Sequence, residues 1–102
     1  MRIILMFDLP SVEKNEKKDY QIFHKELIKN GYFMMQYSVY CKPINFTRKI
    51  KTEVEKLRKK IPKQGNVRVL MVTEKQYEDM YIILGNKNAN EIYNNSERYV
   101  KI

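Results

Sequence analysis

The first apolar segment of the chain is short and continuous. Residues 3–7 are apolar without interruption, and Asp8, Leu9 and Pro10 follow directly. A half-exposed strand would alternate with polar residues, so this run predicts a strand covered on both faces. Asp8 then lies where the strand leaves the core, a position that suits a metal-binding or acid–base carboxylate because the strand fixes its direction. The alternative is turn chemistry, with Asp8 only opening the loop at Pro10.

Two later segments have the spacing of amphipathic helices. The first spans residues 13–30, with Ser11 as a candidate N-cap and Gly31 as its C-terminal stop. The second spans residues 50–61 and stops at Pro62. Their apolar positions are Tyr20, Phe23, Leu27 and Ile28 in the first, and Ile50, Val54, Leu57 and Ile61 in the second.

The remaining segments are typical of strands and turns. Residues 32–44 are rich in aromatic and branched side chains, and a polar break at 36–38 predicts two short antiparallel strands. A further strand is predicted over residues 67–72, after a turn at 64–66. Thr73 is a good N-cap for a helical turn over 74–80, and the apolar residues 81–84 predict a brief strand that ends at Gly85.

The order of these elements predicts an α+β fold. Strand, helix, two strands, helix and strand correspond to a ferredoxin-like βαββαβ two-layer sandwich. We assign this domain to residues 1–85 and an Asn-rich linker with a C-terminal strand to residues 86–102. A strand beyond a loose linker pairs with a neighbouring subunit as easily as with its own sheet, so we expect it to contribute to a homodimer.

Size and cysteine content narrow the class of protein. The chain has 102 residues, which suits one small domain that buries about two-thirds of its unfolded surface. The single cysteine, Cys41, excludes an internal disulfide and a cysteine-cluster metal site, in agreement with a reducing compartment. No apolar run approaches the roughly 20 residues that span a bilayer, and the N-terminus lacks the features of a signal peptide. We therefore expect a cytoplasmic protein without a membrane partner.

Positive charge is concentrated in one segment. The net charge is +8, and residues 48–63 hold eight basic side chains against two glutamates, a net charge of +6. Such a concentration favours a polyanion, most simply nucleic acid, over a merely solvated helix face. The predicted nucleic-acid contacts are Lys14, Lys17, Lys18, Arg48, Lys49, Lys51, Lys56, Arg58, Lys59, Lys60 and Lys63.

Three blocks together resemble a known family. They are Ile-Ile-Leu-Met-Phe-Asp-Leu-Pro at 3–10, the block from Gly31 through Gln-Tyr-Ser-Val-Tyr at 36–40, and Val-Thr-Glu-Lys-Gln-Tyr at 72–77. They are similar to the small CRISPR-associated adaptation protein (the Cas-two family, a CRISPR-associated endoribonuclease family), the partner of the CRISPR integrase. The resemblance covers nearly the whole chain up to Gly85, and the third block is most similar to the variety found beside single-effector interference systems.

The resemblance implies a two-fold homodimer with a metal site. The C-terminal strand, with Tyr99, Val100 and Ile102, would add to the partner's sheet. Mg²⁺ or Mn²⁺ would be held by catalytic Asp8 and its symmetry mate, because Mg²⁺ takes about six oxygens and keeps several waters. Two close carboxylates resist joint ionisation, so any activity should depend on pH and on metal. Members of the family are assigned metal-dependent cleavage of single-stranded RNA and, in some cases, duplex DNA.

Other positions of the family pattern match in part. Phe7 is the aromatic residue before the aspartate, Tyr40 closes the second block, and Lys17 and Lys18 match basic residues early in the first helix. Met34 stands where several nuclease-active relatives carry an arginine. This departure removes a guanidinium that would bind phosphate in a bidentate manner, and it weakens the catalytic assignment.

The remaining reactive side chains are interpreted as structural. Ser38 as a nucleophile would need a base, and the single histidine, His24, lies in the first predicted helix. A turn role for Ser38, and a surface or packing role for His24, are therefore favoured. Cys41 is expected to be a buried small hydrophobe. The aromatic block at 32–44 lacks the glycine-aromatic signature of an RNA-recognition motif, so core packing is favoured over base stacking there.

Two functions remain open, with a third behind them. The first is a scaffold that holds the CRISPR integrase subunits at a fixed spacing and binds double-stranded DNA through phosphate contacts during spacer acquisition. The second is a metal-dependent nuclease with Asp8 as ligand. We favour the scaffold as the biological role and leave the nuclease open. The alternative is a toxin-type, virulence-associated ribonuclease of the same fold.

Overall fold

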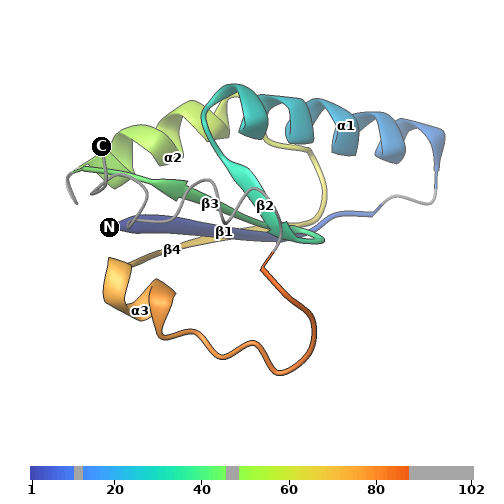
Figure 1. The fold of residues 1–102 in the computed structure, drawn as a ribbon. Coiled ribbons are helices and arrows are strands. Elements are labelled where there is room, and N and C mark those ends of the chain that lie inside the picture. Colours follow the sequence, from blue (N-terminus) through green and yellow to red (C-terminus); the bar gives the residue numbers. More distant parts are fainter. Residues whose placement is uncertain (11–12, 46–48, 88–102) are drawn as a thin grey trace.

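The computed structural model describes residues 1–10, 13–45 and 49–87, and Figure 1 shows helices on both sides of one sheet. The elements in chain order are β1 (Arg2–Asp8), α1 (Lys14–Lys29), β2 (Phe33–Gln36), β3 (Val39–Pro43), α2 (Ile50–Arg58), β4 (Asn66–Val72) and α3 (Glu74–Glu78). This order confirms the predicted βαββαβ sequence of elements and adds α3 after it.

The strands form one antiparallel sheet. Their order is β2-β3-β1-β4, so β1 lies at the centre and hydrogen-bonds to β3 on one side and β4 on the other. Ile4, for example, lies opposite Cys41 of β3 and Leu70 of β4. The predicted ferredoxin-like, two-layer architecture is confirmed by this strand order.

Side chains of β1 are buried on both faces of the sheet, as its unbroken apolar run predicted. Helices α1 and α2 cover one face, where Ile3, Leu5 and Phe7 pack against Phe23 and Leu57. On the opposite face a second cluster joins Ile4, Phe33 and Cys41 to Tyr77 of α3. The sheet thus has a helix-covered face and a face that α3 covers only at one end, which we call the open face (Figure 1).

The predicted helix boundaries need small corrections. The N-cap of α1 is Glu13, which forms a capping box with Glu16, so the assignment of Ser11 is wrong; Ser11 itself lies outside the described residues. Helix α2 ends at Arg58, before the predicted residue 61, because the residue preceding Pro62 is disfavoured in helical conformation. Helix α3 is shorter than predicted, but Thr73 caps it through a capping box as expected.

The predicted strand over residues 81–84 is wrong. These residues belong to no strand, and Ile83 and Leu84 are 97% and 94% exposed. A strand must pair with a neighbouring strand, whereas residues 81–84 line a pocket beside Met35 and Gln36 of β2 without joining the sheet. Apolar composition alone therefore does not make this segment a strand.

The far C-terminus stays a prediction. Most of the Asn-rich linker and the C-terminal strand with Tyr99, Val100 and Ile102 lie outside the described residues, as does Arg48. The division at residue 85 likewise remains an expectation. Within the described ranges, no helix has the length and apolar character needed to cross a membrane.

Candidate nucleic-acid site at the end of strand β1

Asp8 lies where sequence analysis placed it. It is the last residue of β1, it is exposed, and it lies opposite Asn66 at the start of β4. Side chains alternate along a strand, so Asp8 points to the open face together with Ile4 and Met6, while Phe7 points into the helix-covered core. The rigid centre of the sheet therefore presents this carboxylate to solvent.

Asn66 and Arg68 share a pocket with Asp8. The pocket measures about 270 Å³ and is lined by Met6, Phe7, Asp8, Asn66 and Arg68. Arg68 lies opposite Met6 in the ladder and so extends from the same face as Asp8. Its Nε donates a hydrogen bond to Oδ1 of Asn66 at 3.3 Å. A carboxylate, an amide and a guanidinium thus meet at one end of the sheet.

The β2–β3 turn adjoins the same end of β1. The backbone N–H of Phe7 donates to the carbonyl of Ser38 at 3.1 Å. Ser38 has φ of 66°, which confirms its turn role. Tyr37 beside it is 72% exposed, and its ring stacks on Tyr20 of α1 with centroids 6.1 Å apart. An exposed tyrosine is therefore held in a defined place at this end of the molecule.

His24 and Cys41 both have structural roles. Nδ1 of His24 forms a hydrogen bond with the hydroxyl of Tyr40, and the His24 ring stacks on Tyr20. Cys41 is completely buried. These observations confirm the packing roles expected for both residues.

Buried phenols in the core stay neutral at physiological pH. Burial raises the pKa of Tyr32, and the Glu53 carboxylate nearby adds to this shift. Burial also raises the pKa of Tyr40 and of Tyr20. These groups therefore serve as hydrogen-bonding and packing groups and not as acid–base groups.

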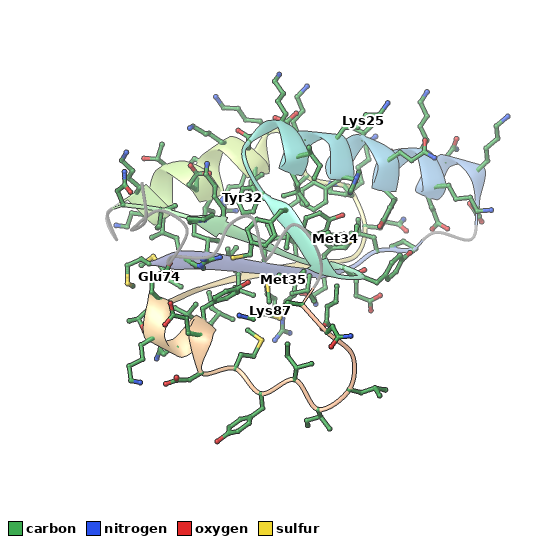
Figure 2. All side chains as sticks on the ribbon, in the orientation of Figure 1. Lys25, Tyr32, Met34, Met35, Glu74 and Lys87 are labelled. Atoms are coloured by element: carbon green, nitrogen blue, oxygen red, sulfur yellow. The ribbon has the colours of Figure 1, made fainter. Side chains whose placement is uncertain are left out.

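Basic side chains cover the outside of the helical layer. Helices α1 and α2 pack on the same face of the sheet, so their solvent-facing lysines point away from it, as Lys25 does in Figure 2. The predicted contacts that are described and exposed are Lys14, Lys17, Lys18, Lys49, Lys51, Lys56, Arg58, Lys59, Lys60 and Lys63. Lys63 follows α2 in the chain. It lines a pocket of about 240 Å³ together with Glu13 and Glu16 at the start of α1.

Two charged residues that the sequence analysis did not single out are buried. Glu53 of α2 is 6% exposed, and its carboxylate accepts hydrogen bonds from Lys42 at 2.7 Å and from the Tyr32 hydroxyl at 3.4 Å. Its position three residues after Ile50 and four before Leu57 places it on the apolar face, which the helical spacing could have revealed.

Arg2 is the second buried charge, with 1% exposure. Its Nε donates to both carboxylate oxygens of Glu74, at 3.0 and 3.1 Å, and its guanidinium carbon lies 3.9 Å from the centroid of the Tyr77 ring. Burial alone would lower the pKa of Arg2, but hydrogen bonds to Glu74 and Cys41 raise it overall. The contact fixes α3, whose first residue Glu74 is labelled in Figure 2, on the open face.

The family can be assigned from comparisons with known proteins. The model of the family described as CRISPR associated protein Cas2 matches residues 1–80. The chain belongs to the Cas2 family. This confirms the resemblance that the three sequence blocks indicated.

Curated relatives of the Cas2 family match over most of the chain. A protein of Campylobacter jejuni is 44% identical over 95 residues, covering 93% of this chain but only 66% of the relative. Proteins of Treponema denticola and Ligilactobacillus salivarius are 44% and 38% identical, each covering 98% of both chains. All three bear the name CRISPR-associated endoribonuclease Cas2.

The aromatic positions of the Cas2 pattern are core positions in this chain. Phe7 and Tyr40 are buried and stack on each other, with ring centroids 5.6 Å apart. Met34 lies opposite Tyr40 and packs against the helix-covered core. An arginine at position 34 would therefore leave the sheet on the face opposite to Asp8.

A divalent cation near Asp8 finds few protein ligands within one copy. Across the described part of the chain, no three His, Cys, Asp or Glu residues lie close enough to hold a metal ion. Mg²⁺ prefers oxygen ligands and usually keeps several waters. The Asp8 carboxylate has the right chemistry for a hydrated ion of this kind, whereas the Asn66 amide oxygen already accepts a hydrogen bond from Arg68.

Proposed function

We propose that this chain acts in CRISPR adaptation as a symmetric homodimer, which spaces the integrase subunits and binds the middle of a short DNA duplex. The observation that supports this proposal is the contrast between the two sides of the molecule. Most of the exposed lysines and arginines lie on the helical layer, whereas the open face and the segment after α3 carry most of the highly exposed apolar side chains beside the basic residues Arg68 and Lys75. The basic side suits phosphate contacts that position a duplex without reading its sequence.

The apolar side suits a second copy of the chain. Leu70, Met80, Tyr81, Ile83 and Leu84 are exposed large apolar residues on or beside the open face. Apolar surface of this kind on a small domain marks an interaction site, and a chain of this size gains stability by association. β4 is an edge strand of the described sheet, and we propose that the partner's C-terminal strand, with Tyr99, Val100 and Ile102, extends the sheet there.

Light scattering and salt-dependent DNA binding test the scaffold. We expect a mass of twice 12.4 kDa and an affinity for duplex DNA that falls steeply with salt, with a slope of about 0.9 for each phosphate contact. Lys59→Ala should reduce this slope, whereas Lys75→Ala, which removes an equal charge from α3, should not. A monomer that ignores duplex DNA in dilute buffer would refute the scaffold.

A second candidate function is metal-dependent endoribonuclease activity, which the pocket around Asp8 favours. Asp8, with its dimer mate, would hold Mg²⁺ or Mn²⁺. A bound ion of this kind polarises a phosphoryl oxygen and lowers the pKa of a bound water. In the hydrolysis, water adds to phosphorus, the bond to one sugar oxygen breaks, and that oxygen leaves with a proton. The name that the relatives bear and the exposed carboxylate at the end of β1 support this candidate.

Asp8→Ala separates the candidate functions when RNA cleavage and spacer integration are measured side by side. We expect cleavage to be abolished and integration to be retained. Failure of integration would count against a scaffold that needs only its basic surface, and preserved cleavage would show that Asp8 is not catalytic. A toxin-type ribonuclease needs no integrase partner, so stable co-purification with integrase subunits would count against that alternative.

A further inference from the structure

The guanidinium of Arg68 is positioned beside Asp8 without neutralising it. In the described part of the chain, no ion pair joins Arg68 to Asp8 or to another carboxylate, and its Nε hydrogen-bonds to the neutral amide of Asn66. An exposed arginine and an exposed aspartate that line one pocket without pairing leave both charges available to a ligand. A ligand suited to both side chains has one negatively charged oxygen for the Arg68 guanidinium and a second oxygen for a cation that the Asp8 carboxylate would hold.

The hydrogen bond to Asn66 orients the guanidinium. An arginine side chain has five N–H donors in one plane, and Nε uses one of them on Oδ1 of Asn66 at 3.3 Å. The four N–H groups on the two terminal nitrogens remain. Two parallel donors of this kind match two oxygens of one phosphate in the bidentate geometry that makes arginine a strong phosphate ligand.

Arg68 and Met34 lie on opposite faces of the sheet. The ladder places Met34 on the helix-covered face and Arg68 on the open face with Asp8. Arg68 of β4 therefore brings a guanidinium to the face where the Asp8 carboxylate lies, which an arginine at position 34 would not do.

We propose that Arg68, oriented by Asn66, binds a phosphodiester of single-stranded RNA in the Asp8 pocket. The proposal rests on the endoribonuclease candidate for its substrate and on the geometry of the pocket for its residues. Arg68 is the residue that contacts phosphate, and Asn66 is a positioning residue that acts through it.

Oligonucleotide binding without metal tests this proposal independently of cleavage. The probe is a six-nucleotide oligouridylate, titrated in EDTA into the full chain labelled with ¹⁵N, with the Arg68 Nε–Hε resonance as readout. We expect this resonance to shift. We also expect Arg68→Ala to reduce the salt slope of binding by about 0.7 for each phosphate that Arg68 would otherwise neutralise, while Lys75→Ala leaves the slope unchanged.

Arg68→Lys distinguishes a geometric role from simple charge. Lysine restores the charge and therefore the slope, but it cannot make the bidentate contact, so cleavage with Mg²⁺ should remain about 10-fold or more below wild type. An Arg68 resonance that stays still while others move, together with an unchanged slope in Arg68→Ala, would overturn the proposal.

The outcomes for the pocket and for the nuclease are separable. If Arg68 responds to the oligonucleotide but the wild-type chain cleaves nothing with Mg²⁺, the phosphate site is supported and the nuclease candidate fails. If cleavage depends on Asp8 but neither cleavage nor binding depends on Arg68, the nuclease candidate is supported and the Arg68 site fails.

Discussion

Replacing Glu53 by glutamine tests whether the buried ion pair holds α2 on the sheet. The change keeps the shape of the side chain but removes its charge, leaving the ammonium of Lys42 with a neutral acceptor. Lys42 comes from β3 and Glu53 from α2, so the 2.7 Å contact between them joins the sheet to the basic helix. Glu55→Gln is a matched control, because Glu55 lies on the same helix and pairs with Arg58 at 3.2 Å but is exposed.

The expected cost follows from burial. Breaking a fully buried pair costs about 3–5 kcal/mol, because one charge remains in a low-dielectric site. The Lys42 side chain is 20% exposed and can recover some hydration, and glutamine still accepts a hydrogen bond, so we expect a decrease of about 2 kcal/mol in unfolding free energy. The exposed control pair should contribute about 0.5 kcal/mol or less.

Urea unfolding followed by circular dichroism measures both variants. With an m-value of about 1.5 kcal/mol per molar urea, Glu53→Gln should lower the midpoint by about 1.3 M and Glu55→Gln by about 0.3 M. Protein concentration is held fixed, because self-association would shift both midpoints. Equal shifts in the two variants would refute the argument from burial. A Lys42→Met, Glu53→Gln double variant whose destabilisation equals the sum of the two single effects would also refute it, because the partners of one ion pair should be coupled.

Three further changes test separate features. Ser38→Gly should raise the free energy of unfolding by about 0.5–1 kcal/mol, measured by urea unfolding, because glycine adopts the positive φ of this turn without strain. Burial raises the folded-state pKa of Tyr32 and Tyr40, so the neutral phenols contribute their full share to the unfolding free energy below about pH 10, and this contribution declines as pH rises beyond it. Tyr32→Phe should therefore flatten the fall of the urea midpoint with rising pH. Ile83→Asp should halve the mass seen by light scattering, and an unchanged mass would exclude this segment from the dimer interface.

Local patterns of apolar and polar residues predict most of the fold. The uninterrupted run at residues 3–7 predicted a strand buried on both faces, because neither face leaves room for polar side chains. The polar break at 36–38 predicted the turn between β2 and β3 because strands of this kind cannot run for thirteen residues in a small domain. Asp8 could be placed at the strand end because the apolar run stops there.

The sequence pattern does not predict which residues far apart in the chain contact each other. That Arg68 shares a face with Asp8 depends on the register of β1 against β4, and a shift of one residue would place it on the other face. Residues 81–84 have the composition of a strand, but strand formation depends on pairing with a neighbouring strand, which composition does not reveal. The partner of Arg2 is separated from it by 72 residues, and no local spacing predicts such a contact.

If the proposed dimer and the candidate nuclease activity are both real, the position of Asp8 links association to cleavage. The ladder puts Asp8 and Leu70 on the same face, and the exposed residues after α3 lie beside that face. Two copies joined there would carry their Asp8 carboxylates toward a common axis and leave both helical layers outside for phosphate contacts. A variant that cannot associate, such as Ile83→Asp, should therefore lose metal-dependent cleavage while keeping weakened, salt-sensitive DNA binding. If the monomeric variant cleaves RNA as fast per chain as the wild type, Asp8 works alone and the shared site is wrong.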